Sequence, residues 1–249
     1  MKAQAQKIAK WIASSMGPYS AMWLTLIIGM GIVLGLALAG AEVYEDVVES
    51  DGVASLDHPA LAYAKTLRTP GLDSAVTAFT NVGGVYGMPI LAVLVAALLT
   101  WKTHNWRPVI LIVAAGAGSL LATVVGKKLI GRVRPATADA VPPYETSPSF
   151  PSGHTLNATV IIGVVVYLLC LEIRRNWLKV LVILAGGAFV IFMGLSRVFL
   201  GHHWLTDVMA AWALGLAWLA LVILAHQLFH AVRHRHNNIN NSVSPAPAE

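Results

Sequence analysis

Long apolar stretches separated by short polar segments dominate this chain. Six of them approach or exceed the roughly 20 residues that an α-helix needs to cross the hydrocarbon core of a bilayer. They lie near residues 20–41, 83–101, 108–126, 155–173, 177–196 and 205–229. The pattern predicts an all-α fold, an integral membrane bundle of six transmembrane helices, built as a single domain over residues 1–249.

The composition supports this prediction. Hydrophobic residues make up 57% of the chain and charged residues 12%, and the mean hydropathy of +0.68 does not suit a water-soluble globule. The first apolar stretch follows a basic segment and ends in ALAGA, which resembles a signal-peptide cleavage site. Its apolar core is longer than the about 7 to 15 residues of a signal peptide, so we expect a retained helix.

Charged residues are distributed unevenly between the two sides that these helices define. If the N-terminus is cytoplasmic, ten of the 17 Lys and Arg lie on its side, but only two of the 12 Asp and Glu. This positive-inside bias predicts that both termini are cytoplasmic, with residues 1–19 and a polar, disordered tail over 232–249 inside. Residues 42–82 then form an external segment.

The net charge of +5 is therefore interpreted as a signal of membrane topology. We find no basic surface interleaved with aromatic residues, so no nucleic-acid partner is expected.

Three polar clusters interrupt the apolar pattern: KKLIGRVRP at the end of the third helix, PSGHT at the start of the fourth, and SRVFLGHHWLTD between the fifth and sixth. When six helices alternate in direction, all of these helix ends emerge on the same face of the membrane. The topology places that face outside. We therefore expect the three clusters to form one site at the external surface.

The first group of candidates suits the binding of a phosphate. Lys127 and Arg134 are seven positions apart, or about two helical turns, so both can point to one side, and Arg197 adds a third cation. Ser152 offers a hydroxyl, and backbone amides near Gly153 would point toward an anion at a helix N-terminus. Such donors can stabilise the charge of a phosphoryl group in the transition state.

The second group suits nucleophilic catalysis. His203 and Asp207 are four positions apart and share one face of a helix, so the carboxylate can fix the imidazole while its other nitrogen attacks. His154 can protonate the leaving oxygen and then activate water. His202 is the alternative nucleophile, but its spacing of five from Asp207 fits one helix face less well.

Simpler interpretations exist for several of these residues. Arg132 and Lys128 are interpreted as topology or surface residues, and the alternative for Ser152 is that it caps a helix and does not bind phosphate. A catalytic zinc is a further alternative, but nearby cations would repel a divalent ion, so no metal or other cofactor is expected. The ligands of that zinc would be His154, His203 and Asp207.

The three clusters resemble, in order and spacing, the motifs of the type-2 phosphatidic acid phosphatase superfamily, and the six-helix layout extends the likeness to most of the chain. The resemblance implies a metal-independent phosphatase with His203 as nucleophile, Asp207 as its orienting partner and His154 acting on the leaving group. The residues that would bind phosphate are Lys127, Arg134, Ser152, Gly153, His154 and Arg197.

Within the superfamily the chain is similar to the bacterial integral-membrane branch of phosphatidylglycerophosphatases and undecaprenyl pyrophosphate phosphatases. The stretch DHPALAYAKTLRTPGLDSAVTAFTNVGG also resembles that branch, in which it lies along the membrane surface. The resemblance implies an enzyme of the bacterial cytoplasmic membrane whose active site faces outward. Its lipid substrate would be undecaprenyl pyrophosphate, phosphatidylglycerol phosphate or phosphatidate.

Two other classes of function remain as alternatives. A transporter or flippase would use the cations only to hold a lipid phosphate, and a membrane scaffold would have no use for three converging polar clusters. The oligomeric state stays open, because the small residues of GMGIVLG suit contacts within one subunit as well as between subunits.

Overall fold

The computed structural model describes residues 20–243, which form eight α-helices and two short 3₁₀ helices and contain no β-strand. The predicted all-α class is therefore confirmed. The elements in chain order are α2 Ser20–Glu49, η1 Gly52–Leu56, α3 Asp57–Thr66, α4 Pro70–Val82, α5 Gly87–Thr103, α6 Arg107–Ile130, η2 Thr137–Asp139, α7 Gly153–Glu172, α8 Asn176–Phe199 and α9 Leu205–Val243.

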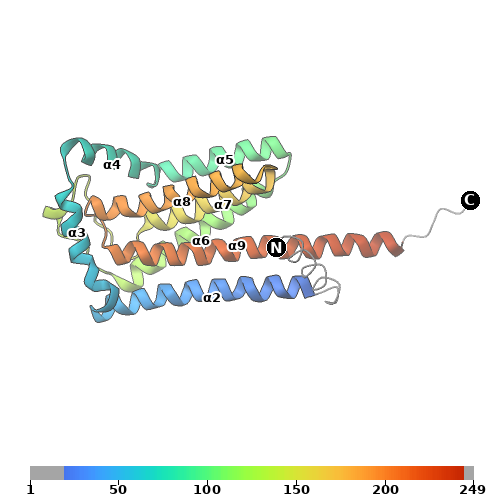
Figure 1. The fold of residues 1–249 in the computed structure, drawn as a ribbon, viewed down its shortest axis with the longest axis horizontal. Coiled ribbons are helices and arrows are strands. Elements are labelled where there is room, and N and C mark those ends of the chain that lie inside the picture. Colours follow the sequence, from blue (N-terminus) through green and yellow to red (C-terminus); the bar gives the residue numbers. More distant parts are fainter. Residues whose placement is uncertain (1–19, 244–249) are drawn as a thin grey trace, which may run out of the picture.

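Within residues 20–243, five helices are long and apolar enough to cross a membrane by themselves: α2, α6, α7, α8 and α9. The predicted span at 83–101 corresponds to α5, which is long enough for a span only together with α4; the two helices are bent by 48° at a short break (Figure 1). The break carries the sequence GGVYG, and a side chain at Gly87 would lie 2.4 Å from the carbonyl oxygen of Asn81. Only glycine allows the two helices to approach so closely at this corner.

Two helices are longer than the apolar pattern indicates. Helix α2 continues to Glu49, beyond the predicted end at 41, and stops where Ser50 and Gly52 adopt positive φ angles of 62° and 50°. Helix α9 continues to Val243, beyond the predicted end of the last span at 229, and the part of the predicted tail after 243 lies outside the described residues. No Gly or Pro interrupts the sequence between Gly215 and that end. The predicted cytoplasmic segment 1–19 lies outside the described residues.

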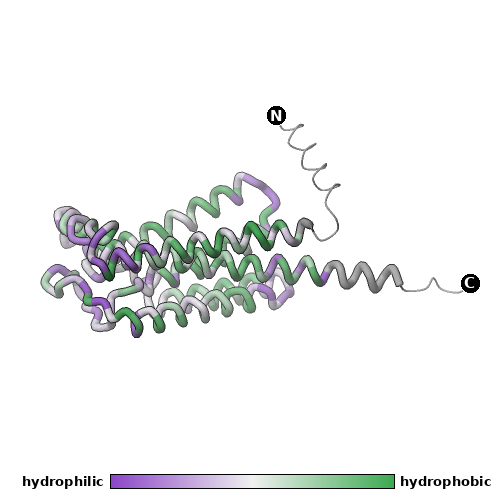
Figure 2. Tube along the Cα trace, turned by 90° about the horizontal axis from the view of Figure 1, so that it is seen from below, coloured by the Kyte–Doolittle hydropathy of each residue, from purple (hydrophilic) through white to green (hydrophobic). Residues whose placement is uncertain are grey.

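Helix α7 lies at the centre of the bundle, where it packs against α6, α8 and α9, while α2 packs along α9. Its side chains Ala158, Val160 and Val164 are fully buried. The lipid-facing helices are mostly apolar on their exposed sides, and hydrophilic residues gather at the two ends of the bundle in Figure 2. This distribution is typical of a protein whose middle lies in hydrocarbon.

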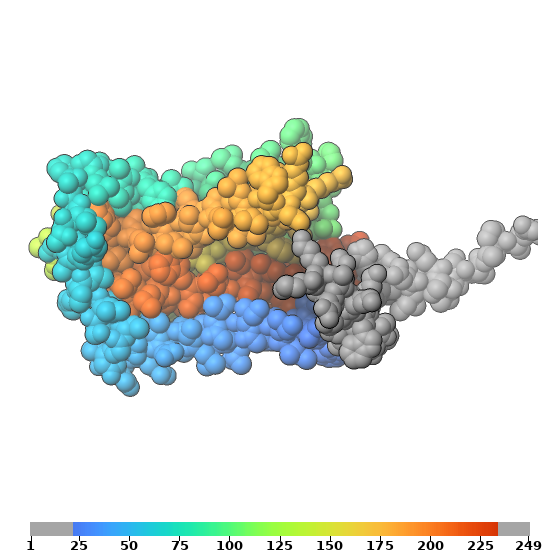
Figure 3. Space-filling view, viewed as in Figure 1, coloured from blue at the N-terminus to red at the C-terminus, as the bar shows by residue number. Residues whose placement is uncertain are grey.

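The predicted external segment contains two further helices. Helix α3 runs across one end of the bundle, and α4 leads from it into α5. In the space-filling view these residues cover that end of the molecule (Figure 3). The segment 57–84 that resembles the bacterial branch therefore forms a helical layer over one end of the bundle.

Candidate active site

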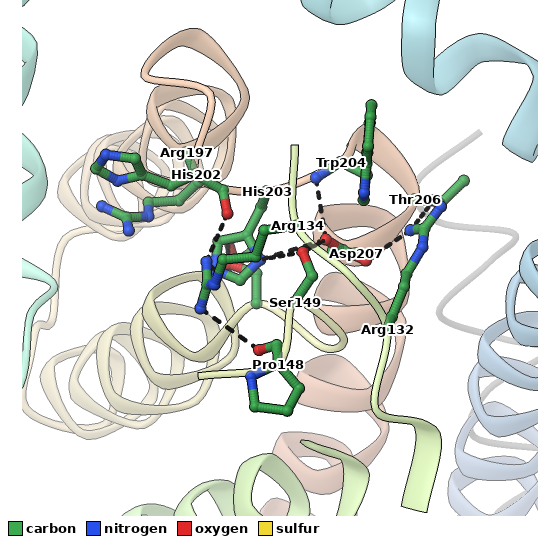
Figure 4. A network of polar contacts seen from close by, with 12 residues as sticks. Arg132, Arg134, Pro148, Ser149, Arg197, His202, His203, Trp204, Thr206 and Asp207 are labelled. Carbon is green, nitrogen blue, oxygen red and sulfur yellow. Dashed lines mark hydrogen bonds and ion pairs between the residues drawn. The ribbon is translucent and has the colours of Figure 1, made fainter. Parts of the chain in front are cut away.

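The three polar clusters meet at the end of the bundle that α3 covers, as predicted. They come from the end of α6, the linker 131–152, the start of α7, the end of α8 and the start of α9. Figure 4 shows the centre of this site, where Arg134, His203 and Asp207 point toward one another. The convergence follows from helices that alternate in direction, since neighbouring ends then share one face.

A tight turn between α8 and α9 positions the two adjacent histidines. The backbone amides of His202 and His203 both donate hydrogen bonds to the carbonyl oxygen of Arg197, at 3.0 and 3.2 Å. Gly201 has a φ of 70°, and a side chain there would lie 2.3 Å from the carbonyl oxygen of Asp139 in the linker. The glycine thus lets the turn and the linker approach each other.

His203 is 1% exposed and lies between an anion and a cation. Its Nδ1 is 3.3 Å from Oδ2 of Asp207, and its Nε2 is 3.1 Å from the guanidinium nitrogen NH1 of Arg134. Since arginine only donates, this pairing fits a neutral imidazole with its proton on Nδ1. Burial lowers the pKa of His203 to about 4, against the opposing effect of Asp207, so the ring is neutral at pH 7.

The carboxylate of Asp207 is fully buried and has further partners. Its Oδ2 accepts hydrogen bonds from the hydroxyl of Ser149 and from the backbone amide of Trp204, the latter at 2.9 Å. Its Oδ1 is 2.6 Å from NH1 of Arg132. A buried carboxylate held by so many donors stays ionised.

Arg132 is therefore not the topology or surface residue that we predicted. Its side chain is 17% exposed, and it bridges the carboxylates of Asp207 and Asp57, each at 2.6 Å. The fold buries this cation because it brings two carboxylates from distant segments to the same point. Lys128 is exposed, in agreement with its interpretation as a surface residue.

The three predicted phosphate-binding cations lie around a carboxylate that the sequence did not indicate. NH2 of Arg134 is 2.7 Å from Oε2 of Glu145, and Arg197, whose side chain is 2% exposed, forms an ion pair with Oε1. The Nε2 atom of His203 is 4.0 Å from the same carboxylate. Lys127 lies beside this group and donates to Ser147 Oγ at 3.2 Å.

Glu145 therefore occupies the centre of a site built for an anion. Burial alone would raise the pKa of Glu145, but the positive charges of Arg197 and Arg134, and that of His203 when its ring is protonated, outweigh it and lower this pKa to about 2. Glu145 comes from the Pro-rich linker, where no periodicity predicts the position of a side chain. The one signal in the sequence for an anion at this place is the excess of cations in the three motifs, and it does not indicate which residue supplies that anion.

The PSGH cluster opens α7, as expected, but with different contacts. Ser152 is at the N-cap position, yet its side chain makes no capping hydrogen bond; its hydroxyl lies 2.9 Å from that of Thr155. The interpretation of Ser152 as a helix cap is therefore wrong. A side chain at Gly153 would lie 3.2 Å from Thr123 of α6, so this glycine also lets two helices pack closely.

His154 and His202 both line a cavity of about 510 Å³ that also borders Glu145 and Arg197. His154 is thus on the same side of the site as the carboxylate. The Nε2 atom of His202 pairs with the carbonyl oxygen of Val141 at 2.7 Å, and its ring does not contact Asp207. The geometry favours His203 over His202 as the partner of Asp207.

The predicted zinc alternative has little geometric support. Among the residues that the structure describes, no three His, Cys, Asp or Glu side chains are grouped as metal ligands would be. The carboxylate of Asp207 is instead directed at Arg132 and Ser149.

The sequence and the fold both match known proteins. The profile of the PAP2 superfamily matches residues 107–231, which include every predicted site residue, and the chain therefore belongs to this superfamily. Phosphatidylglycerophosphatase B of Bacillus subtilis is 32% identical over 176 residues, covering 70% of this chain and 85% of the relative. An undecaprenyl-diphosphatase of Sulfolobus acidocaldarius is 29% identical, covering 55% of this chain and 64% of the relative.

A solved structure has the same fold. The crystal structure of a transmembrane PAP2-type phosphatidylglycerolphosphate phosphatase from Bacillus subtilis matches with a TM-score of 0.69 and 28% sequence identity. The match covers 80% of this chain and 96% of that protein. The chain is thus similar to membrane proteins named for the removal of phosphate from lipids.

Proposed function

We propose that this chain is a membrane lipid phosphatase that removes the terminal phosphate of a lipid phosphate or diphosphate through a phosphohistidine intermediate. The observation that carries the proposal is the placement of His203, with one ring nitrogen facing the carboxylate of Asp207 and the other facing an anion site lined by cations. The names of the relatives support a lipid phosphate as the substrate.

In the first step, the terminal phosphate takes the place of the Glu145 carboxylate among the three cations, Lys127, Arg134 and Arg197. Nε2 of His203 attacks phosphorus while the bond from phosphorus to the lipid oxygen breaks. His154 supplies the proton that this oxygen takes up, and the lipid alcohol or lipid phosphate leaves. The cations stabilise the charge on the three equatorial oxygens.

In the second step, His154 takes a proton from a water molecule, and the water oxygen attacks the phosphorus of phosphohistidine. The bond between phosphorus and Nε2 of His203 breaks, inorganic phosphate leaves, and the neutral imidazole is restored. Asp207 stabilises the cationic form of the ring whenever it develops, because its carboxylate accepts the proton on Nδ1 in a hydrogen bond.

The cavity next to the site supports a lipid as substrate. A second cavity of about 1050 Å³ lies between α5, α6 and α7 and is lined almost entirely by apolar side chains. It shares Gly84 and Val85 with the polar cavity that contains His154 and Glu145. A lipid whose phosphate lies in the polar cavity could therefore place its chain in the apolar cavity. This geometry suits a substrate that enters sideways from the bilayer.

The topology of the protein is part of the same proposal. The distribution of Lys and Arg supports cytoplasmic termini, which would put the α3 end of the bundle and the site on the outer face of the bacterial cytoplasmic membrane. Labelling of a Tyr144→Cys variant with a membrane-impermeant maleimide in whole cells would test this orientation. Tyr144 is 55% exposed beside the site, and absence of labelling from outside would contradict the orientation.

The reaction is tested by phosphate release from the full chain in detergent. Phosphatidylglycerol phosphate, undecaprenyl pyrophosphate and phosphatidate would each be assayed with EDTA present, with the His203→Ala variant as control. We expect release in EDTA from the wild type and none from the variant. Loss of activity in EDTA would favour the zinc alternative, full activity of His203→Ala would exclude this nucleophile, and binding without release would favour a transporter.

A further inference from the structure

A buried charge network joins the external helix α3 to the carboxylate beside His203. Arg132 lies between two carboxylates, with NH1 at 2.6 Å from Oδ1 of Asp207 and NH2 at 2.6 Å from Oδ2 of Asp57. The side chains of the two acids are 0% and 3% exposed. One guanidinium thus serves two buried carboxylates, and its charge offsets part of the cost of burying theirs.

Asp57 has a second contact, with the first turn of α9. Its Oδ1 accepts a hydrogen bond from the backbone amide of Thr206 at 2.8 Å, and its Oδ2 one from the hydroxyl of Thr206 at 2.7 Å. Thr206 is the second residue of α9, and Asp207 is the third. A carboxylate from α3 therefore caps the helix that carries Asp207, where the positive end of the helix dipole favours it.

We propose that Arg132 and Asp57 are positioning residues, through which helix α3 sets both the orientation of the Asp207 carboxylate and the charge that it presents to His203. This inference rests on the proposed function. The positive charge of Arg132 partly neutralises the carboxylate of Asp207. The negative charge of Asp57 partly neutralises Arg132 and so weakens the effect of Arg132 on Asp207. The external segment thus takes part in catalysis without touching the substrate.

The two residues then act in opposite directions on the protonation of the nucleophile. Without the charge of Arg132, the carboxylate of Asp207 stabilises the protonated ring more strongly, and the pKa of His203 rises. Without the charge of Asp57, Arg132 neutralises Asp207 more fully, and this pKa falls. The other charged or titratable groups around the ring are Arg134 after α6, Glu145 in the linker, His154 on α7 and Arg197 on α8.

A purely structural role would give a different result. If the network only held α3 on the bundle, its loss would lower the melting temperature and leave the pH dependence of catalysis unchanged. A matched control exists on the same helix, because Lys65 forms an exposed ion pair with Asp139 of the linker. The Lys65→Gln variant removes the positive charge of this ion pair between α3 and the linker.

The test compares Arg132→Gln, Asp57→Asn and Lys65→Gln in the full chain, with phosphatidylglycerol phosphate in mixed micelles. We expect Arg132→Gln to lower kcat on the order of ten- to a hundredfold, the range for a lost hydrogen bond between charged groups, with KM changed less than about threefold. The acid limb of its pH–rate profile should move to higher pH, and that of Asp57→Asn to lower pH. Lys65→Gln should move neither.

The outcomes separate this inference from the proposed function. Absence of phosphate release by the wild type would refute the function itself. With an active wild type, acid limbs that stay in place, or that move in the same direction in Arg132→Gln and Asp57→Asn, would overturn the positioning role. If Arg132→Gln fails to fold, the test depends on Asp57→Asn alone. This isosteric change keeps an acceptor for Thr206, and the positioning role still requires the acid limb of its pH–rate profile to move to lower pH.

Discussion

If the cations around Glu145 bind phosphate as proposed, its carboxylate competes with the phosphate of the substrate, and this competition can be measured. The two ion pairs with Arg134 and Arg197 place the carboxylate among the groups that we propose to bind phosphate. Any phosphate must displace it. Replacing Glu145 by Gln keeps the shape of the side chain but removes its charge, so we expect inorganic phosphate to bind the variant more tightly.

The magnitude follows from the contacts that the anion must replace. A hydrogen bond to a charged group contributes about 1.5 to 3 kcal/mol, compared with about 1 kcal/mol for a neutral one, so two contacts lose roughly 1 to 4 kcal/mol when the carboxylate becomes an amide. The side chain of Glu145 is 28% exposed, and solvent reduces this difference. About 1 to 2 kcal/mol remains, or a factor of roughly 5 to 30 in binding.

The assay is product inhibition by inorganic phosphate at pH 7. At this pH Glu145 is ionised in the wild type, because its pKa is about 2. The inhibition constant of Glu145→Gln should be roughly 5 to 30 times lower than that of the wild type. Asp139→Asn is the matched control, since it removes a charge from the same linker at an ion pair outside the site.

An inhibition constant that is unchanged or higher in Glu145→Gln would refute this reasoning. The carboxylate would then not occupy the phosphate position in solution. An equal decrease in Asp139→Asn would show that the effect depends on the net charge of the linker and not on the contacts of Glu145.

Three further predictions concern the nucleophile, the apolar cavity and the turn before the histidines. Burial lowers the pKa of His203 to about 4, so the acid limb of kcat/KM, corrected for ionisation of the substrate, should be centred near pH 4; an acid limb centred near 6.5 would contradict this. Ala117→Trp should fill the cavity between α5 and α6 and reduce hydrolysis of long-chain more than short-chain lipid phosphates, whereas Ala185→Trp on the exposed face of α8 should spare both. Gly201→Ala should lower the melting temperature and the activity because its φ is 70°, with a loss of about 2 kcal/mol or more in unfolding free energy, whereas Gly187→Ala, with open space around it, should be neutral.

The general architecture and most of the candidate site could be predicted from the sequence. Apolar length identifies the spans, and the alternation of their directions is enough to bring Lys127, His154 and His203 to one end of the bundle. The spacing of four predicted that the side chains of His203 and Asp207 meet, and they do, but His203 lies in the turn before α9 and only Asp207 lies in the first turn of the helix. These features depend on local periodicity and on the order of the helices.

The remaining contacts depend on the path of a segment without periodicity. The linker is held by tertiary contacts, which include hydrogen bonds from Val141 to Leu200 and from Ser149 to Arg132, and such contacts place Glu145 in the anion site. Arg132 looked like a surface charge because its partner Asp57 lies 75 residues away in the sequence. Side chains that act through distant partners leave no local pattern.

The two cavities that meet at Gly84 and Val85 have a consequence for the energetics of turnover. Extracting a lipid from the membrane costs about 0.8 kcal/mol for each methylene group that reaches water. An enzyme whose chain cavity opens beside its catalytic chamber avoids that transfer, because only the head group changes its surroundings. Its encounter rate would then depend on two-dimensional diffusion in one leaflet and on the surface density of the lipid, and dilution of the substrate with inert lipid would slow it at constant bulk concentration.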